Sequence, residues 1–382
     1  MAVLGIPHGD EHLDVLMTLG RHEEFTLFAS VALLSSARHK GRADKDTALW
    51  ELAQQVTGWG RIHVVECLAG TPDEAIRAWM LRDGYRNSIM YEYLAHVCAT
   101  TGGLLGALRD PCPDDALLRG AGDIIEALLI GGPAQDMDDY DDGAEAVMAY
   151  TERIRDWPSA GMEEFLALRR IARYVEDEKA DWTARGRGWS DEIRGRIAAN
   201  ARAVTGRPQW AERAVASMQA EDDTVFWNAA EVAEALGIDT WETRYERQRA
   251  GREQWYFLAK TRDAARMDRL LSLARAELDL AAVASGPDME PGFGPAFAAH
   301  RALDSLLSGL GAFPGKGPDL ILAGLCSPVV RNRNLAVRAL SQWGQSNWPP
   351  EARAALTAAL AAEPDDSARR RMANVLAGRP PE

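Results

Sequence analysis

The sequence predicts an all-α protein, arranged as an α-solenoid of stacked antiparallel helix pairs. Two observations predict this fold class. Apolar residues recur at helical spacing along almost all of the 382 residues, and short breaks carrying Gly, Pro, Asp or Asn separate the helical segments. Segments rich in Val, Ile and Thr with the two-residue period of strands are missing, so we expect almost no strand.

Helices are expected in order along the chain, and one helix start has a clear signal. Thr71-Pro72-Asp73-Glu74 combines Thr71 as N-cap, a proline at the first helical position and acids in the first turn. A paired unit then repeats roughly every 30–45 residues, as in helical arrays. The predicted helical segments are 13–19, 25–33, 49–56, 62–68, 75–82, 88–98, 116–129, 145–154, 163–175, 193–204, 210–218, 225–236, 240–261, 264–280, 296–310, 318–326, 332–343, 350–361 and 367–376.

We expect one array over residues 1–382 rather than separate domains, with its most regular part at about 290–378. There, Ser327–Leu340 resembles the second half of a HEAT unit, in which a proline-bearing turn leads into the pattern V-R-x-x-A-x-x-A-L. Pro364–Ala373 has a similar pattern one unit later, where Asp and Ser can cap the helix start and arginines cover its outer face.

The charge is uneven. The chain carries a formal net charge of −14, and residues 1–150 hold 24 of its 57 acidic residues but only 11 of its 43 basic ones. Nucleic-acid affinity depends mostly on neutralising phosphates, so this part would repel nucleic acid and anionic membrane surfaces. The asymmetry suits attraction of a partner with a basic segment, although solubility alone is an alternative explanation.

Cysteines and hydropathy exclude several classes of protein. The four cysteines form no C-x-x-C pair, so a zinc knuckle or a thioredoxin-like redox motif is not expected. Residues 1–10 lack the pattern of a secretory signal, and no run of about 18 apolar residues predicts a membrane span. We therefore expect a cytoplasmic protein with no membrane partner and no cofactor. The cysteines are Cys67, Cys98, Cys112 and Cys326.

Histidines and aspartates suggest a candidate metal site. Six of the seven histidines lie within the first 96 residues, and His22-Glu23 is the one His-Glu dipeptide, a pairing that some HEAT-repeat hydroxylases use to hold two irons. The loop at 133–143 adds Asp136, Asp138 and Asp139, and long loops in solenoids often carry function. Ordinary capping or surface histidines and a solvated acidic loop are the alternatives.

The same loop does not match an EF-hand. With Asp138 at position 1, Tyr140 stands at position 3 and Ala149 at position 12, where the motif needs a bidentate glutamate. A cation site without the EF-hand pattern stays open as an alternative for this loop.

Arginine and asparagine supply a candidate binding site. Arg331, Asn332, Arg333, Asn334 and Arg338 could together line one end of the array. Guanidinium groups suit carboxylate or phosphate partners because their N–H groups can bind two oxygens at once. The alternative is that these arginines pair with acids in neighbouring repeats.

Five longer stretches carry a family resemblance: Leu19–Phe28, Trp50–Ala53, Gly58–His63, Asn87–Ala95 and Ser327–Leu340. They resemble a family of uncharacterised bacterial HEAT-like proteins, some of which carry the label limonene hydroxylase. The resemblance implies a helical-repeat fold over most of the chain, and it supplies no catalytic residues to carry over. The sequence shows neither the proximal cysteine and haem pocket of a haem-thiolate oxygenase nor the Rossmann fingerprint that is normal for a flavin enzyme.

The sequence thus predicts an interaction scaffold or adaptor that binds a protein partner on the concave surface of the solenoid. Two alternatives stay open. One is an enzyme in the groove, either a metal-dependent hydroxylase or another enzyme acting on a small molecule. The other is a nucleic-acid-processing solenoid, which the charge disfavours.

Overall fold

A computed structural model describes residues 13–36, 42–132, 134–185 and 188–381. Within these ranges the chain forms twenty-two α-helices and no strand, which confirms the all-α prediction. The single β-type contact in this part is an isolated bridge between Glu290 and Val329.

The chain divides into two compact units, unit 1 at Met1–Ile238 and unit 2 at Asp239–Glu382. Each unit has its own cluster of buried hydrophobic side chains. The prediction of one array over residues 1–382 is not tested by this division and stays a prediction.

Unit 1 contains thirteen described α-helices and one π-helical turn. They are α2 (Leu13–Gly20), α3 (Glu23–Ser36), α4 (Arg42–Ala53), α5 (Gly58–Cys67), α6 (Glu74–Trp79), the π-helical turn η2 (Met80–Gly84), α7 (Glu92–Gly102), α8 (Leu104–Arg109), α9 (Asp115–Ile130), α10 (Gly143–Asp156), α11 (Met162–Val175), α12 (Asp191–Thr205), α13 (Gln209–Ser217) and α14 (Asp223–Ala235).

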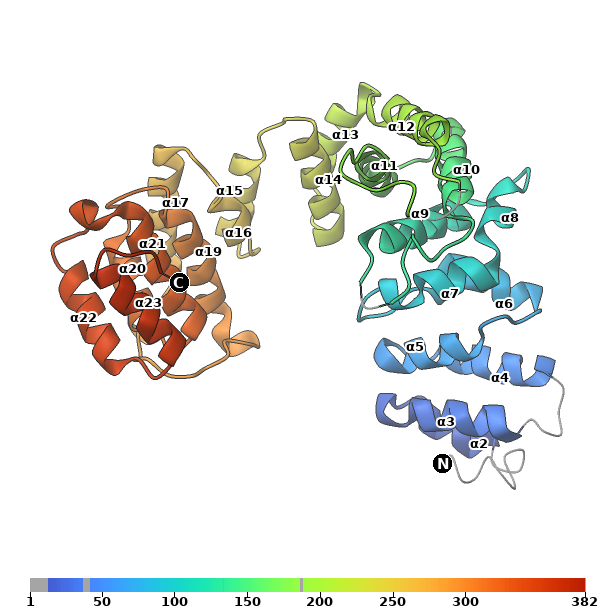
Figure 1. The fold of residues 1–382 in the computed structure, drawn as a ribbon, viewed down its shortest axis with the longest axis horizontal. Helices are drawn as coiled ribbons and strands as arrows, with labels where there is room; N and C mark the ends of the chain where they lie inside the picture. Colours follow the sequence, from blue (N-terminus) through green and yellow to red (C-terminus); the bar gives the residue numbers. More distant parts are fainter. Residues whose placement is uncertain (1–12, 37–41, 133, 186–187, 382) are drawn as a thin grey trace. The chain divides into compact units, whose positions relative to one another are not determined.

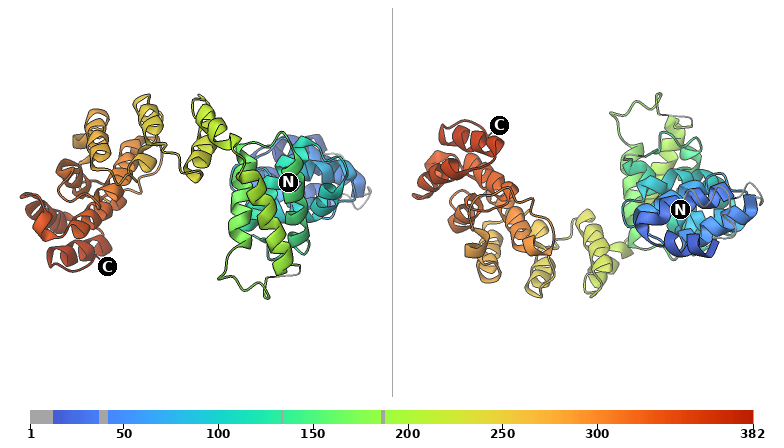
Figure 2. Two further views of the ribbon diagram at one scale, coloured as in Figure 1. Left: turned by 90° about the horizontal axis from the view of Figure 1, so that it is seen from above. Right: turned by 90° about the horizontal axis from the view of Figure 1, so that it is seen from below.

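These helices pack mainly on neighbours that are close in sequence. One row runs through the unit, in which α3 contacts α5, α5 contacts α7, α7 contacts α9, α9 contacts α11 and α11 contacts α14. The other helices pair with members of this row, for example α2 with α3, α4 with α5 and α13 with α14. Figure 1 shows the first pairs as successive layers, and in the views of Figure 2 these layers lie one behind another.

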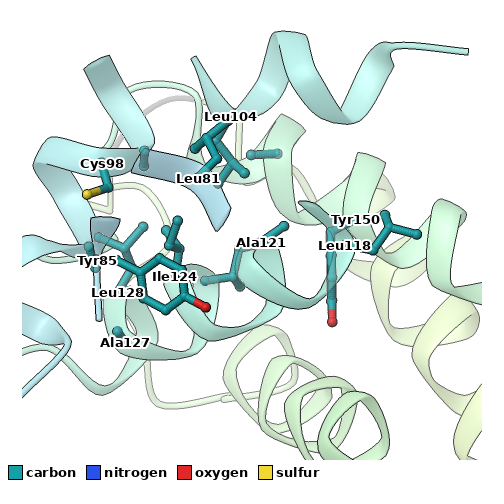
Figure 3. Packing of buried hydrophobic residues seen from close by; sticks show 14 of the residues in the cluster. Leu81, Tyr85, Cys98, Leu104, Leu118, Ala121, Ile124, Ala127, Leu128 and Tyr150 are labelled. Carbon is teal, nitrogen blue, oxygen red and sulfur yellow. The ribbon is translucent and has the colours of Figure 1, made fainter. Parts of the chain in front are cut away.

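Helix α9 lies at the centre of unit 1, and its apolar face explains why. Leu118, Ala121, Ile124 and Leu128 follow at helical spacing and are buried, together with side chains from η2, α7 and α8 (Figure 3). Gly120 brings this helix close to η2, because a Cβ placed there would lie 2.0 Å from the carbonyl oxygen of Leu81. The backbones can approach this closely because glycine has no side chain.

We predict that Gly120→Ala destabilises the protein by about 1–3 kcal/mol, because the added methyl group would force α9 and η2 apart. The measurement is urea unfolding followed by circular dichroism. Gly195→Ala in α12 is the matched control, since a Cβ there meets nothing within 4 Å, and it should raise stability by about 0.5–1 kcal/mol. Equal effects of the two substitutions would contradict this account.

Unit 2 repeats the same packing principle. One row joins α16, α19, α21 and α23, each in contact with the next, and α18, α20 and α22 form a second row in the same way. The helices of this unit are α15 (Trp241–Arg249), α16 (Trp255–Leu258), α17 (Ala264–Glu277), α18 (Leu280–Val283), α19 (Ala298–Leu310), α20 (Pro318–Leu325), α21 (Val330–Trp343), α22 (Ala352–Ala362) and α23 (Asp366–Leu376), with short 3₁₀ turns at Pro295–Phe297 and Gln345–Asn347.

The predicted single helix over 240–261 is wrong, because the structure has two helices there, α15 and α16. The chain leaves α15 at Gly251, whose φ of +80° favours glycine. The side chain of Gln248 then accepts a hydrogen bond from the backbone N–H of Gln254 at 2.7 Å, which fixes the turn between the two helices.

Several helix starts differ from prediction, among them those of α4 at Arg42 and α5 at Gly58, and two of the differences have a clear side-chain cause. Asp73, rather than Thr71, caps α6, and its carboxylate accepts hydrogen bonds from the N–H groups of Ala75 and Ile76. Helix α7 begins at Glu92 rather than near residue 88, because the side chain of Asn87 holds residues 87–90 in a turn. Helix α8, at Leu104–Arg109, has no counterpart in the prediction because it is only 6 residues long.

Candidate functional site

The five candidate binding residues of α21 separate into two groups. Arg331, Asn334 and Arg338 line a cavity at the surface of unit 2, whereas Asn332 and Arg333 are fully buried. Positions 331, 334 and 338 share one face of a helix because they are three and four residues apart. The structure therefore brings three of the five residues together and places the other two in the interior.

Arg333 forms a buried ion pair with Glu363, and both side chains are 0% exposed. Its Nε and Nη2 donate to the two carboxylate oxygens at 2.7 and 2.6 Å, and Nη1 donates to the carbonyl oxygen of Ser327 at 2.7 Å. Glu363 also accepts a hydrogen bond from the backbone N–H of Asp365. These contacts join α21 to the connection between α22 and α23. Arg333 therefore stabilises the interior of unit 2.

We predict that Arg333→Met destabilises the protein by about 3–5 kcal/mol, because it leaves the charge of Glu363 buried without a partner. The double variant Arg333→Met/Glu363→Leu should recover most of this loss, since it removes both charges. Urea unfolding of the two variants measures the difference, and a double variant no more stable than the single one would contradict the prediction.

Asn332 connects α21 to α19 through a buried polar network. Its Nδ2 donates to the backbone oxygen of His300 at 2.8 Å and to Oδ1 of Asp304 at 2.6 Å. Both partners are acceptors, so the orientation of the amide is fixed and its Oδ1 must accept. Ser327 Oγ lies 2.8 Å from that Oδ1, and His300 Nδ1 lies 2.9 Å from it. His300 therefore carries its proton on Nδ1 when the ring is neutral.

This proton assignment has a direct test. We predict that the neutral ring of His300 is the Nδ1–H tautomer, visible in the ¹⁵N shifts and two-bond couplings of the histidine ring in a long-range ¹H–¹⁵N spectrum. Asn332→Ala should remove the preference, because the acceptor that selects the tautomer is lost. An Nε2–H ring in the unmodified protein would show that the network is assigned incorrectly.

The cavity over α21 has a volume of about 710 Å³. Arg331 is held on its rim by an ion pair with Asp304, whose pKa is raised by burial although Arg331 and Asn332 act in the opposite direction. Arg371 of α23 donates to the side chain of Asn334 at 3.3 Å. The complete lining is Met289, Glu290, Pro291, Val330, Arg331, Asn334, Leu335, Arg338, Arg371 and Pro381.

The lining combines three guanidinium groups with one carboxylate and several apolar side chains. Arg338 is exposed and forms no ion pair with any other described residue. An exposed guanidinium beside apolar surface suits a ligand that carries a carboxylate or phosphate next to an apolar group.

The candidate metal residues lie at two separate places in unit 1. At the start of α3, His22 Nδ1 accepts from the N–H of Glu24, and Glu23 accepts from the N–H of Trp59 at 3.3 Å. These are capping contacts at helix starts, which is the alternative that the sequence left open for His22.

The acidic loop after α9 has its own internal bonds. Asp136 accepts from the N–H of Asp138, Asp139 accepts from the N–H of Asp136, and Asp138 accepts from the hydroxyl of Tyr174. Across the described ranges, no group of three or more His, Cys, Asp or Glu side chains could hold a metal ion. The structure therefore does not bring His22 and Glu23 together with these three aspartates.

A second cavity, which sequence reasoning missed, lies on the row of helices in unit 1. It has a volume of about 330 Å³, and five carboxylates but one guanidinium, that of Arg170, line it. On α9, α11 and α14 the lining residues recur every three or four positions, with Glu126 and Ala127 adjacent on α9, so each of these helices presents one face. The lining is Tyr91, Glu92, Asp123, Glu126, Ala127, Ile130, Glu163, Leu166, Arg170, Thr224, Asn228 and Glu231.

The acidic cavity keeps an excess of negative charge. Arg170 forms ion pairs with Glu126 and Glu231, and Arg86, which is not part of the lining, forms one with Asp123 at 3.6 Å. Glu92 and Glu163 have no ion pair with another described residue. Burial raises the pKa of Asp123, whereas the hydrogen bond from the hydroxyl of Tyr85, at 2.5 Å, favours its charged form. A cationic group entering this cavity would meet carboxylates from α9, α11 and α14.

No described helix has the length and apolar character needed to cross a bilayer. Comparisons with models of protein families, with curated proteins and with solved structures find no match to this chain. The resemblance to HEAT-like proteins labelled limonene hydroxylase thus stays a prediction from the sequence alone.

Proposed function

We propose that this protein is a cytoplasmic interaction scaffold, an α-solenoid of HEAT-like helix pairs that binds a basic segment of a protein partner. Row packing supports the solenoid proposal, because each helix contacts mainly its neighbours along the chain, as in helical-repeat proteins. Such arrays expose an extended face formed by one helix of each pair, and this face commonly serves as the binding surface.

The observation that most supports this proposal is the acidic cavity, which is lined by residues of α9, α11 and α14. All three helices belong to the row of unit 1, so the cavity lies on one continuous helix layer. Lysine or arginine side chains of a partner would bind its carboxylates, and Tyr91, Ile130 and Leu166 provide apolar contact for their aliphatic stems. The excess of acids in residues 1–150 would also steer such a partner toward this unit.

The cavity over α21 in unit 2 offers a second contact of opposite charge. Arg331, Arg338 and Arg371 favour a carboxylate-bearing stretch of a partner. Each cavity would therefore favour partner segments of the opposite charge.

The two alternatives keep their own tests. Elemental analysis of the purified protein would identify stoichiometric iron, as the hydroxylase alternative requires. A mobility shift at low salt would reveal nucleic-acid binding. No particular observation on the described residues favours either alternative over the scaffold.

We predict that charge reversal in the acidic cavity abolishes partner capture. Glu163→Arg/Glu231→Arg changes two exposed carboxylates of the lining. The full chain, immobilised and exposed to cytoplasmic extract of its source, should capture a partner that the variant does not, as identified by mass spectrometry. Capture by the unmodified chain should weaken with added salt, because the screening length falls from about 10 Å at 0.1 M to about 3 Å at 1 M.

The matched control is Glu178→Arg/Glu212→Arg, which changes the net charge equally at two exposed positions outside the cavity. This control should capture the same partner as the unmodified chain. The proposal fails if the cavity variant captures that partner as well as the control does, or if capture does not depend on salt.

A further inference from the structure

Helix α3 has a surface unlike that of an ordinary exposed helix. Every exposed side chain between Phe25 and Leu34 is a large hydrophobic residue, and no exposed charge interrupts them. Exposed helix faces of soluble proteins normally carry polar and charged residues. The exposed residues in this stretch are Phe25, Leu27, Phe28, Val31 and Leu34.

The neighbouring helix extends this surface. Val15 and Leu19 of α2, four residues apart and therefore on one helix face, are exposed as well. On α3, Leu27, Val31 and Leu34 follow the i, i+4, i+7 spacing of helices that pack on another helix. We call these seven exposed side chains of α2 and α3 the α2–α3 apolar face.

Among the described helices, α3 stands at the end of its row, and no further described helix packs on this face. Helices α5, α7, α9 and α11 each contact a row neighbour on both sides, whereas α3 has one described row neighbour, α5, besides its contacts with α2 and α4. The buried side chains of α3, among them Ala29, Ala32 and Leu33, belong to the core of unit 1. The terminal helices of an array need a polar outer surface if water is to cover them, and between Phe25 and Leu34 α3 lacks one.

We propose that the α2–α3 apolar face pairs with the same face of a second copy of this chain, forming a two-fold symmetric dimer. Charge argues for this occupant, because a charged partner would lose hydration at an uncharged surface without gaining an ion pair. A second copy presents the same uncharged residues, and a two-fold axis matches one patch against itself.

The exposed area fits a dimer as well. Seven side chains that are each about two-fifths exposed leave on the order of 500 Å² of apolar surface per copy, near the upper end for a monomer's largest patch. Two copies would bury on the order of 1,000 Å² before polar atoms at the rim are added, which reaches the area that a specific interface needs.

Sedimentation velocity of the full chain at micromolar concentrations tests the proposal. The unmodified chain should sediment as a dimer, and Val31→Glu should convert it to a monomer. Val225→Glu is the matched control, since Val225 is 44% exposed and Val31 42%, and both lie in unit 1. The control should remain dimeric, and circular dichroism should show that both variants keep their helical content.

Two further measurements distinguish loss of the dimer interface from a folding defect in one variant. Phe28→Glu, at a position that is 50% exposed, should give a monomer in the same way. The melting temperature of the unmodified chain should rise with protein concentration, as expected when association stabilises the folded state. A monomeric unmodified chain would overturn the proposal, whatever covers the face, and so would a dimer that survives both substitutions.

Discussion

The packing of each helix on the next along the chain is the constraint on which this structure depends. A single helix pair has too little interior to cover its own apolar faces, so each pair must be covered by its neighbours. In unit 1 this produces the row from α3 to α14, and in unit 2 the rows through α19, α21 and α23 and through α18, α20 and α22. Both described cavities lie against such rows, so the packing that builds the core also positions the candidate sites.

The fold class follows from the sequence because helical periodicity is a local property. Helices such as α9 and α11 match their predicted ranges within two residues, since their apolar residues repeat at 3.6-residue spacing. The break at Gly251 is not predicted, although residues 246–254 carry almost no apolar side chain; the positive φ of that glycine and the hydrogen bond between Gln248 and Gln254 end the helix there.

The candidate sites were only partly predictable. Spacing could have separated Arg331, Asn334 and Arg338 from Asn332 and Arg333, because only the first three share a helix face. Which face of α21 is exposed depends on how the helix packs on its neighbours, and the local sequence does not determine that packing. The acidic cavity was harder to predict, because its carboxylates come from helices that are tens of residues apart in the sequence. Charge counting predicted an acidic surface but not the row that gathers these side chains.

The buried pair of Arg333 and Glu363 also bears on how this chain can change over generations. Because either residue alone would be an unbalanced charge in the interior, a mutation at one position restricts which residues the other can tolerate. The two sites, thirty residues apart, should therefore covary among descendants of this gene, and exchange for an apolar pair would have to pass through a less stable intermediate. The residues that position 333 can tolerate therefore depend on which residue already stands at position 363.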